Sequence, residues 1–139
     1  MDGKHIQISC PDEAGSYFYN YKGTHSIVLM AVVDAKYQII YADVGCNRRV
    51  SDGGVWDRCS LNVLLEEGRA GLPGDEALPG SKSGKVMPYT FVADDAFPLK
   101  RHIMKPFSFR DQSEHQRIFS YRVSRARRVA ENAFGILCS

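Results

Sequence analysis

The sequence of 139 residues predicts a single α/β domain, in which a mixed sheet has helices packed on it. The main observation is the order of its segments: three strand patterns, then a helix pattern, another strand and a long amphipathic helix. A second observation is the composition, 44% hydrophobic and 24% charged, which is ordinary for a globular protein. The longest apolar run, residues 27–33, has seven residues, whereas a membrane span needs about 20. We therefore expect no membrane association, and the N-terminus lacks the apolar stretch of a secretory signal.

The first half of the chain predicts three antiparallel strands. Polar and apolar residues alternate over residues 4–10, which is a strand pattern that Pro11 ends. Runs rich in β-branched residues predict two more strands over 24–33 and 37–44. The three residues that separate these runs, Asp34 to Lys36, are few enough for a hairpin turn.

The second half predicts a helix, a strand and a longer helix. Ser51 and Asp52 are candidate N-caps for a helix over 55–67. Residues 68–88 hold five Gly and three Pro, so we expect a long loop. A strand follows over 86–93, and Pro98 is expected to open a short helical piece. Residues 115–137 carry apolar side chains at helical spacing, which predicts a long helix with one buried face.

Cysteine spacing and charge say little about chemistry by themselves. The four cysteines, at 10, 46, 59 and 138, form no CxxC pair, and we interpret them as reduced packing residues. Residues 1–99 carry nine Lys and Arg against thirteen Asp and Glu, a net charge of −4, whereas residues 100–139 carry nine against three, a net of +6. That division suits a protein that holds cations in one place and polyanions in another. A simply solvated basic helix face explains it as well.

Three acidic residues stand out from the rest. Asp2 precedes the first strand, Asp94 ends a strand expected to be buried, and Glu131 lies at the edge of the apolar stripe of the last helix. Carboxylates that converge need a counter-charge, and Mg²⁺ or Mn²⁺ would supply one. The spacing by itself favours simpler roles, in which Asp94 caps the following turn and Glu131 pairs with Arg127 or Arg128 one turn earlier.

Longer blocks of sequence resemble a known family. They are residues 2–6 with Cys10 and Pro11, residues 19–26, residues 33–35, Gly45 with residues 51–55, residues 94–99 from Asp94 to Leu99, and residues 121–135. In this order they resemble the endonuclease domain of PIF/Harbinger-type transposases, within the DDE superfamily. The resemblance covers nearly the whole chain. It departs at Arg48, where the family usually has glycine, and at Ser120, where it usually has asparagine.

The resemblance implies an RNase H-like fold and a nuclease that uses Mg²⁺ or Mn²⁺ to hydrolyse DNA phosphodiester bonds, acting in the nucleus. Residue by residue, it assigns the catalytic, metal-binding triad to Asp2, Asp94 and Glu131. In this scheme a metal held by the two aspartates activates water, and the glutamate completes the ligands of a second metal. Asp34 and Asp52 match family blocks outside the triad, so we expect structural or supporting roles for them.

DNA contacts are expected from the last helix. The candidates are Arg122, Arg125, Arg127 and Arg128, although the last two could instead only balance Glu131. Transposases of this family carry an N-terminal DNA-binding region, and only Met1 precedes Asp2 here. We therefore expect a truncated domain that cleaves weakly and relies on a separate DNA-binding protein. The alternative is a catalytically impaired, domesticated remnant that acts as a DNA- or protein-binding module.

Overall fold

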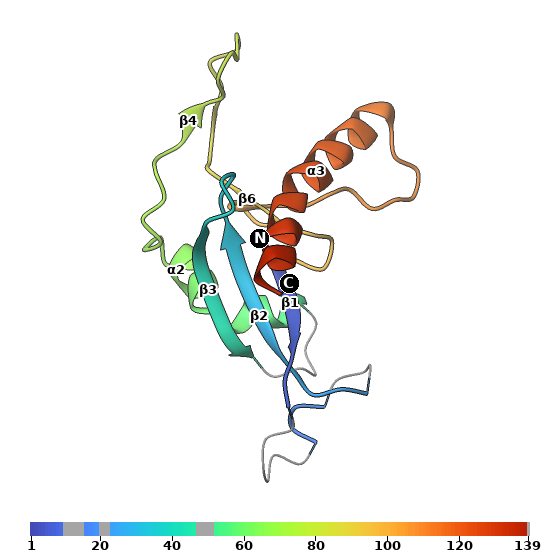
Figure 1. The fold of residues 1–139 in the computed structure, drawn as a ribbon. Helices are drawn as coiled ribbons and strands as arrows, with labels where there is room; N and C mark the ends of the chain where they lie inside the picture. Colours follow the sequence, from blue (N-terminus) through green and yellow to red (C-terminus); the bar gives the residue numbers. More distant parts are fainter. Residues whose placement is uncertain (10–15, 20–22, 47–51, 139) are drawn as a thin grey trace.

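The computed structural model describes residues 1–9, 16–19, 23–46 and 52–138 (Figure 1). Its elements, in chain order, are β1 (Asp2–Gln7), β2 (Ser26–Val33), β3 (Ile39–Cys46), α1 (Asp52–Arg58), α2 (Ser60–Glu66), β4 (Glu76–Ala77), β5 (Val86–Met87), β6 (Phe91–Val92), β7 (Ile103–Met104) and α3 (Glu114–Leu137). The mixed α/β architecture expected from the sequence is confirmed. No helix in the described part of the chain is long and apolar enough to cross a membrane.

The three N-terminal strands form an antiparallel sheet in the order β1-β2-β3, as predicted. The turn between β2 and β3 is built on Asp34, whose Oδ1 accepts hydrogen bonds from the backbone N–H groups of Lys36 and Gln38 at 2.8 and 2.9 Å. Tyr37 adopts a φ of 65° in this turn. The carboxylate thus satisfies two turn amides, which is the structural role expected for Asp34.

A second, parallel pair of strands meets the sheet at the start of β1. β6 and β7 pair in parallel. The Met1 amine donates a hydrogen bond to the carbonyl oxygen of Val92 at 2.5 Å, so β6 lies beside the beginning of β1. The β1-β2-β3 sheet and the β6-β7 pair are separate sheets that meet at this hydrogen bond. The chain segments that carry Asp2 and Asp94 are therefore spatial neighbours although 91 residues separate Met1 from Val92.

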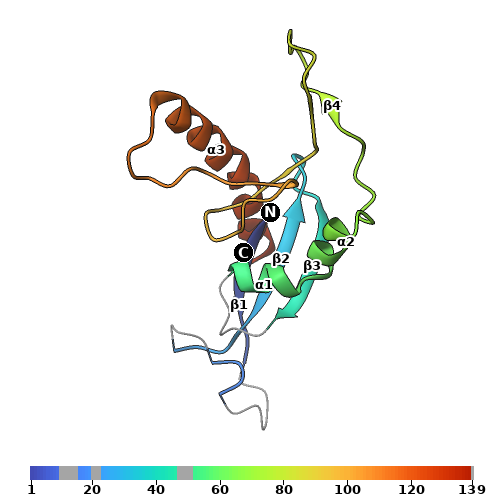
Figure 2. The same cartoon turned by 180° about the vertical axis from the view of Figure 1, so that it is seen from behind.

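Helices cover both faces of the sheet, with α1 and α2 on one face and α3 across the other (Figures 1 and 2). β2 alternates between the two layers and is buried on both sides. Its residues Val28, Met30 and Val32 join the larger core with Trp56 and Phe97. The intervening Leu29 and Ala31 pack with Phe134 of α3, together with the half-buried Ile6 and Val33.

Several predicted boundaries differ from the structure. The predicted strand 4–10 begins earlier, at Asp2, and ends at Gln7; Cys10 and Pro11 lie outside the described residues. The predicted strand 86–93 is two short strands separated by residues 88–90, the first of which is Pro88, with no N–H to donate to a sheet. The short helical piece at Pro98 is wrong, because that segment forms turns that lead into β7.

The predicted helix 55–67 is interrupted at Cys59, and a tertiary contact explains the break. Cys59 is fully buried with an extended backbone, and it separates α1 from α2. The Tyr41 hydroxyl of β3 lies 2.8 Å from the Ser60 hydroxyl and accepts a hydrogen bond from the Leu61 N–H at 3.3 Å. One amide of the first turn of α2 is thereby satisfied from the sheet. Ser51, a predicted cap, lies outside the described residues.

Tyr41→Phe should lower the free energy of unfolding by about 1 kcal/mol near neutral pH, since the Leu61 amide loses its acceptor. Burial raises the pKa of Tyr41 to about 12. An unfolded tyrosine ionises near pH 10, so the folded state binds this proton more tightly. The contribution of Tyr41 is therefore complete below about pH 10 and is lost as the pH rises toward 12. Urea denaturation of both proteins at several pH values between about 8 and 11 measures this.

Tyr37→Phe is the matched control, because the hydroxyl of the half-exposed Tyr37 makes no hydrogen bond within the described segments. It should leave the free energy of unfolding almost unchanged at every pH. If Tyr37→Phe and Tyr41→Phe behave alike, the link between β3 and α2 is energetically unimportant.

Candidate functional site

Asp94 follows the fully buried Ala93 in the sequence, two residues after the end of β6. Its Oδ1 accepts a hydrogen bond from the Ala96 N–H at 2.9 Å, so it caps the following turn. Its Oδ2 lies 3.4 Å from Nη1 of Arg127 on α3, and the Asp94 side chain is only 22% exposed. The capping role considered from the sequence is therefore present. One carboxylate oxygen nevertheless faces α3.

Glu131 is bound by the same arginine. Arg127 lies one turn before it on α3, and its Nη2 donates a hydrogen bond to Glu131 Oε1. The Arg127 side chain is 26% exposed, so solvent screens these pairs less than it screens a fully exposed pair. A single guanidinium thus bridges the carboxylate at the end of β6 and the carboxylate of the last helix.

Asp2 begins β1 opposite Ala31 of β2. Its Oδ1 accepts a hydrogen bond from the Gly3 N–H at 3.0 Å. The Met1 amine precedes Asp2 and is influenced by the charges of Asp2, Asp94 and Arg127. Burial lowers the pKa of this amine below its usual value, the Asp2 and Asp94 carboxylates act to raise it, and the Arg127 charge acts to lower it. Asp2, Asp94 and Arg127 therefore all lie within electrostatic range of one amine.

The three carboxylates offer suitable chemistry for a metal, but they are not assembled around one point. Oxygen donors are those that Mg²⁺ and Mn²⁺ prefer. Within residues 1–9, 16–19, 23–46 and 52–138, no three His, Cys, Asp or Glu side chains are close enough together to hold an ion. The Arg127 guanidinium binds both Asp94 and Glu131. For these two carboxylates to share a metal, that guanidinium has to leave.

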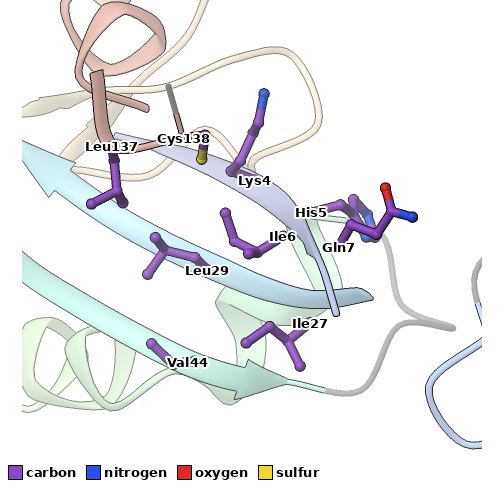
Figure 3. A pocket seen from close by; sticks show the side chains of 9 residues that line it. All are labelled: Lys4, His5, Ile6, Gln7, Ile27, Leu29, Val44, Leu137 and Cys138. Atoms are coloured by element: carbon purple, nitrogen blue, oxygen red, sulfur yellow. The ribbon is translucent and has the colours of Figure 1, made fainter. Parts of the chain in front are cut away.

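A groove of about 400 Å³ opens beside this cluster, between the sheet and α3. Met1, Val92 and Arg127 line it, so a ligand in the groove would reach the guanidinium. A second groove of about 530 Å³ lies on the α3 side of the sheet, near the end of that helix (Figure 3). Its walls include Ile6, Leu29 and Leu137, and none of the residues that line it is an Asp or Glu. Of these two grooves, the first reaches the cluster through Arg127, whereas Asp2, Asp94 and Glu131 are not among the residues that line it.

The four arginines of α3 that were expected to contact DNA fall into two groups. Arg127 is held in the ion pairs described above. Arg122, Arg125 and Arg128 are exposed, and no carboxylate in the described part of the chain lies within ion-pairing distance of them. Of the two arginines that could balance Glu131, Arg127 does so. The other three remain available to bind an anion.

Sequence reasoning missed the contact between Arg127 and Asp94, because nothing in the local spacing reports it. It also gave no role to Asp95, which pairs with Lys105 at 3.3 Å and is 69% exposed. Asp52 begins α1, but its side chain lies outside what the structure describes. Cys59 is a buried free thiol, as expected of a packing residue, whereas Cys138 is an exposed free thiol.

The family model described as DDE superfamily endonuclease matches residues 1–138. The chain belongs to the DDE superfamily endonuclease family. No curated protein and no solved structure matches it significantly. The mixed α/β fold of this DDE-family chain is consistent with an RNase H-like nuclease domain.

Membership in the DDE family suggests a nuclease or transposase domain, and endonucleases of this superfamily generally use divalent metals. A nuclease domain acts on DNA. The assignment of Asp2, Asp94 and Glu131 as the metal-binding residues of this DDE-family chain stays a prediction.

Proposed function

We propose that this chain is the nuclease domain of a PIF/Harbinger-type transposase, which hydrolyses DNA phosphodiester bonds in the nucleus with Mg²⁺ or Mn²⁺. One observation carries the proposal. Asp94 and Glu131, far apart in sequence, meet at a single guanidinium, beside the strand that begins with Asp2. The positively charged side chain of Arg127 lies between two of the three carboxylates that the resemblance assigns to the site.

In this function Asp2, Asp94 and Glu131 would hold the metal, with the Arg127 guanidinium displaced from the two carboxylates that it now binds. The bound metal supplies a Lewis acid that lowers the pKa of water and stabilises charge on the reacting phosphate. Asp94 remains anchored by the Ala96 N–H, which fixes one of its oxygens. The released Arg127 guanidinium becomes available to a phosphate oxygen, an acceptor that suits its geometry. The exposed Arg122, Arg125 and Arg128 bind the flanking DNA backbone.

The second candidate is a catalytically impaired binding module. The observation that favours it is that Arg127 already pairs with both Asp94 and Glu131, so each of these carboxylates has a counter-charge without a metal. A module of this kind would bind DNA through α3 without cutting it. The two functions differ in whether the protein binds a divalent cation at Asp94.

Adding Mg²⁺ or Mn²⁺ should raise the melting temperature of the wild-type protein, and Asp94→Asn should abolish this gain. A cation at ten times its dissociation constant stabilises the folded state by about 1.4 kcal/mol. For a domain of this size that is roughly a 5 °C rise. Differential scanning fluorimetry with and without metal measures it. Relief of carboxylate repulsion should add little in Asp94→Asn, because Arg127 offsets that repulsion.

Asp95→Asn is the matched control, since Asp95 is the next residue and pairs with Lys105 outside the cluster. It should keep the full metal-induced rise. Arg127→Gln should lower the melting temperature of the metal-free protein and increase the rise on adding metal, because the two carboxylates lose their competing cation. Equal metal-induced rises in wild type, Asp94→Asn and Asp95→Asn would contradict a metal site at Asp94.

A further inference from the structure

A groove of about 600 Å³ lies at the other end of α3, between its first turns and the segment 105–112. Phe109 and Tyr121 line it, and both are unusually accessible: Phe109 is 94% exposed and Tyr121 is 60% exposed. Large aromatic side chains normally bury their surface, so two exposed ones in the same groove indicate a site that binds a ligand. Arg117 and Asp111 complete the polar part of the same groove.

The segment that presents Phe109 is anchored. The Phe107 N–H donates to the Ser120 hydroxyl at 3.1 Å, and the Phe107 ring packs edge-on against Phe119 with centroids 5.3 Å apart. Gln112 Nε2 donates to the carbonyl oxygens of Phe107 and Ser108 at 2.9 and 2.7 Å. These bonds fix the backbone just before Phe109 and tie the Gln112 side chain to it. The ring is therefore held out into solvent by a bonded segment.

Positive charge extends from this groove along α3. Arg117, Tyr121, Arg125 and Arg128 follow at intervals of four, four and three residues, which places them on one stripe of the helix. No carboxylate among the described residues pairs with these arginines. The stripe ends beside Glu131, about 15 Å along the helix from Tyr121 at 1.5 Å per residue. A polyanion on this stripe would connect the groove with the proposed metal site.

We propose that this groove binds unpaired nucleotides of a DNA strand, whose bases stack on Phe109 and Tyr121 while Arg117 and Arg125 contact its phosphates. The proposal deepens the proposed function and rests on DNA being its substrate. Aromatic side chains stack on the faces of bases, and only an unpaired base exposes its face. Asp111, the acidic group of the groove, can accept a hydrogen bond from a base amino group.

Charge argues against a second copy of the chain as the occupant. Residues 105–128 carry seven Lys and Arg against two Asp and Glu, so two such surfaces would repel each other. Aromatic rings interleaved with unpaired arginines are typical of proteins that bind single strands. A docking site for an apolar protein segment would need only hydrophobic area, and the experiment uses this difference.

The test measures the affinity of the full chain for a fluorescent single-stranded oligonucleotide and for the matching duplex, by anisotropy at low salt without divalent metal. Phe109→Leu keeps an apolar side chain but removes the ring, and it should weaken single-strand binding about tenfold. It should leave duplex binding unchanged. Phe109→Trp should restore single-strand affinity. Because Phe109 is almost fully exposed, melting temperatures should match the wild type.

Arg117→Gln is the electrostatic counterpart. It should weaken binding to both DNA forms and reduce the salt dependence by about one phosphate contact. Unchanged single-strand affinity in Phe109→Leu, equal losses for both DNA forms, or no single-strand binding by the wild type would each overturn the groove proposal. Ring-dependent single-strand binding by a protein that shows no metal-dependent melting shift would instead overturn only the metal site and leave this groove intact.

Discussion

Asp2→Asn, Asp94→Asn and Glu131→Gln should each lower Mn²⁺-dependent cleavage of DNA by at least about a hundredfold. A metal contributes several kcal/mol of charge stabilisation in the transition state, and each 1.36 kcal/mol is a factor of ten in rate. Every substitution removes one anionic ligand while keeping the side chain's size. The Oδ1 of an asparagine at position 94 can still accept from the Ala96 N–H, so the turn is preserved. Cleavage of nonspecific duplex DNA at low salt, where the basic helix binds phosphates, is the measurement.

Two neighbouring carboxylates provide the controls for this prediction. Asp95→Asn alters the residue next to Asp94 but only its exposed pair with Lys105, and Glu114→Gln alters the first turn of α3. Both variants should cleave within about twofold of the wild type, since exposed ion pairs contribute little. If Asp95→Asn loses as much activity as Asp94→Asn, the assignment of the second acidic residue is wrong.

Phe97→Ala should lower the free energy of unfolding by about 3–5 kcal/mol, the range for truncating a buried aromatic residue. Phe97 is 1% exposed, and its ring packs edge-on against the fully buried Trp56 with centroids 6.1 Å apart. It follows the turn that Asp94 caps, and the Phe97 N–H donates to the Asp94 carbonyl oxygen at 3.3 Å. The cavity therefore opens directly behind the candidate site. Urea denaturation measures the loss.

Leu99→Ala is the comparison for Phe97→Ala, because Leu99 lies two residues further and is 71% exposed. Its effect should stay within about 0.5 kcal/mol. Phe97→Leu should lie between the two, since it retains much of the buried volume. A loss below about 1 kcal/mol in Phe97→Ala would show that the contact with Trp56 does not hold the Asp94 turn in place.

Patterns that repeat along the chain were sufficient to predict the main elements. Alternation and β-branched runs gave three antiparallel strands, and helical spacing predicted 115–137, which the structure extends by one residue to Glu114. The turn at Asp34 was likewise predictable, since the Asp34 side chain accepts hydrogen bonds from amides only two and four residues away. Each of these features depends on contacts within a few residues or on one repeating face, and such information is local.

Breaks within elements were not predictable in this way. The interruption at Cys59 coincides with the contact that Tyr41 of β3 makes with the start of α2. The helix propensity of residues 55–67 cannot predict a break that depends on a residue outside that segment. The parallel pairing of β6 with β7 was missed for a related reason. Two-residue strands have no period to detect, so partners alone define them.

The sequence by itself determined that Arg127 and Glu131 lie one helical turn apart, because a separation of four residues fixes that distance in any α-helix. It also supplied Asp94 at the end of a strand and the excess of positive charge on α3. Only the tertiary structure decided that Arg127 reaches Asp94 as well as Glu131, since that contact requires α3 to pack beside β6. The tertiary structure likewise decided that Phe109 and Tyr121 line one groove. Contacts of this kind join residues that are distant in the chain, and no local spacing encodes them.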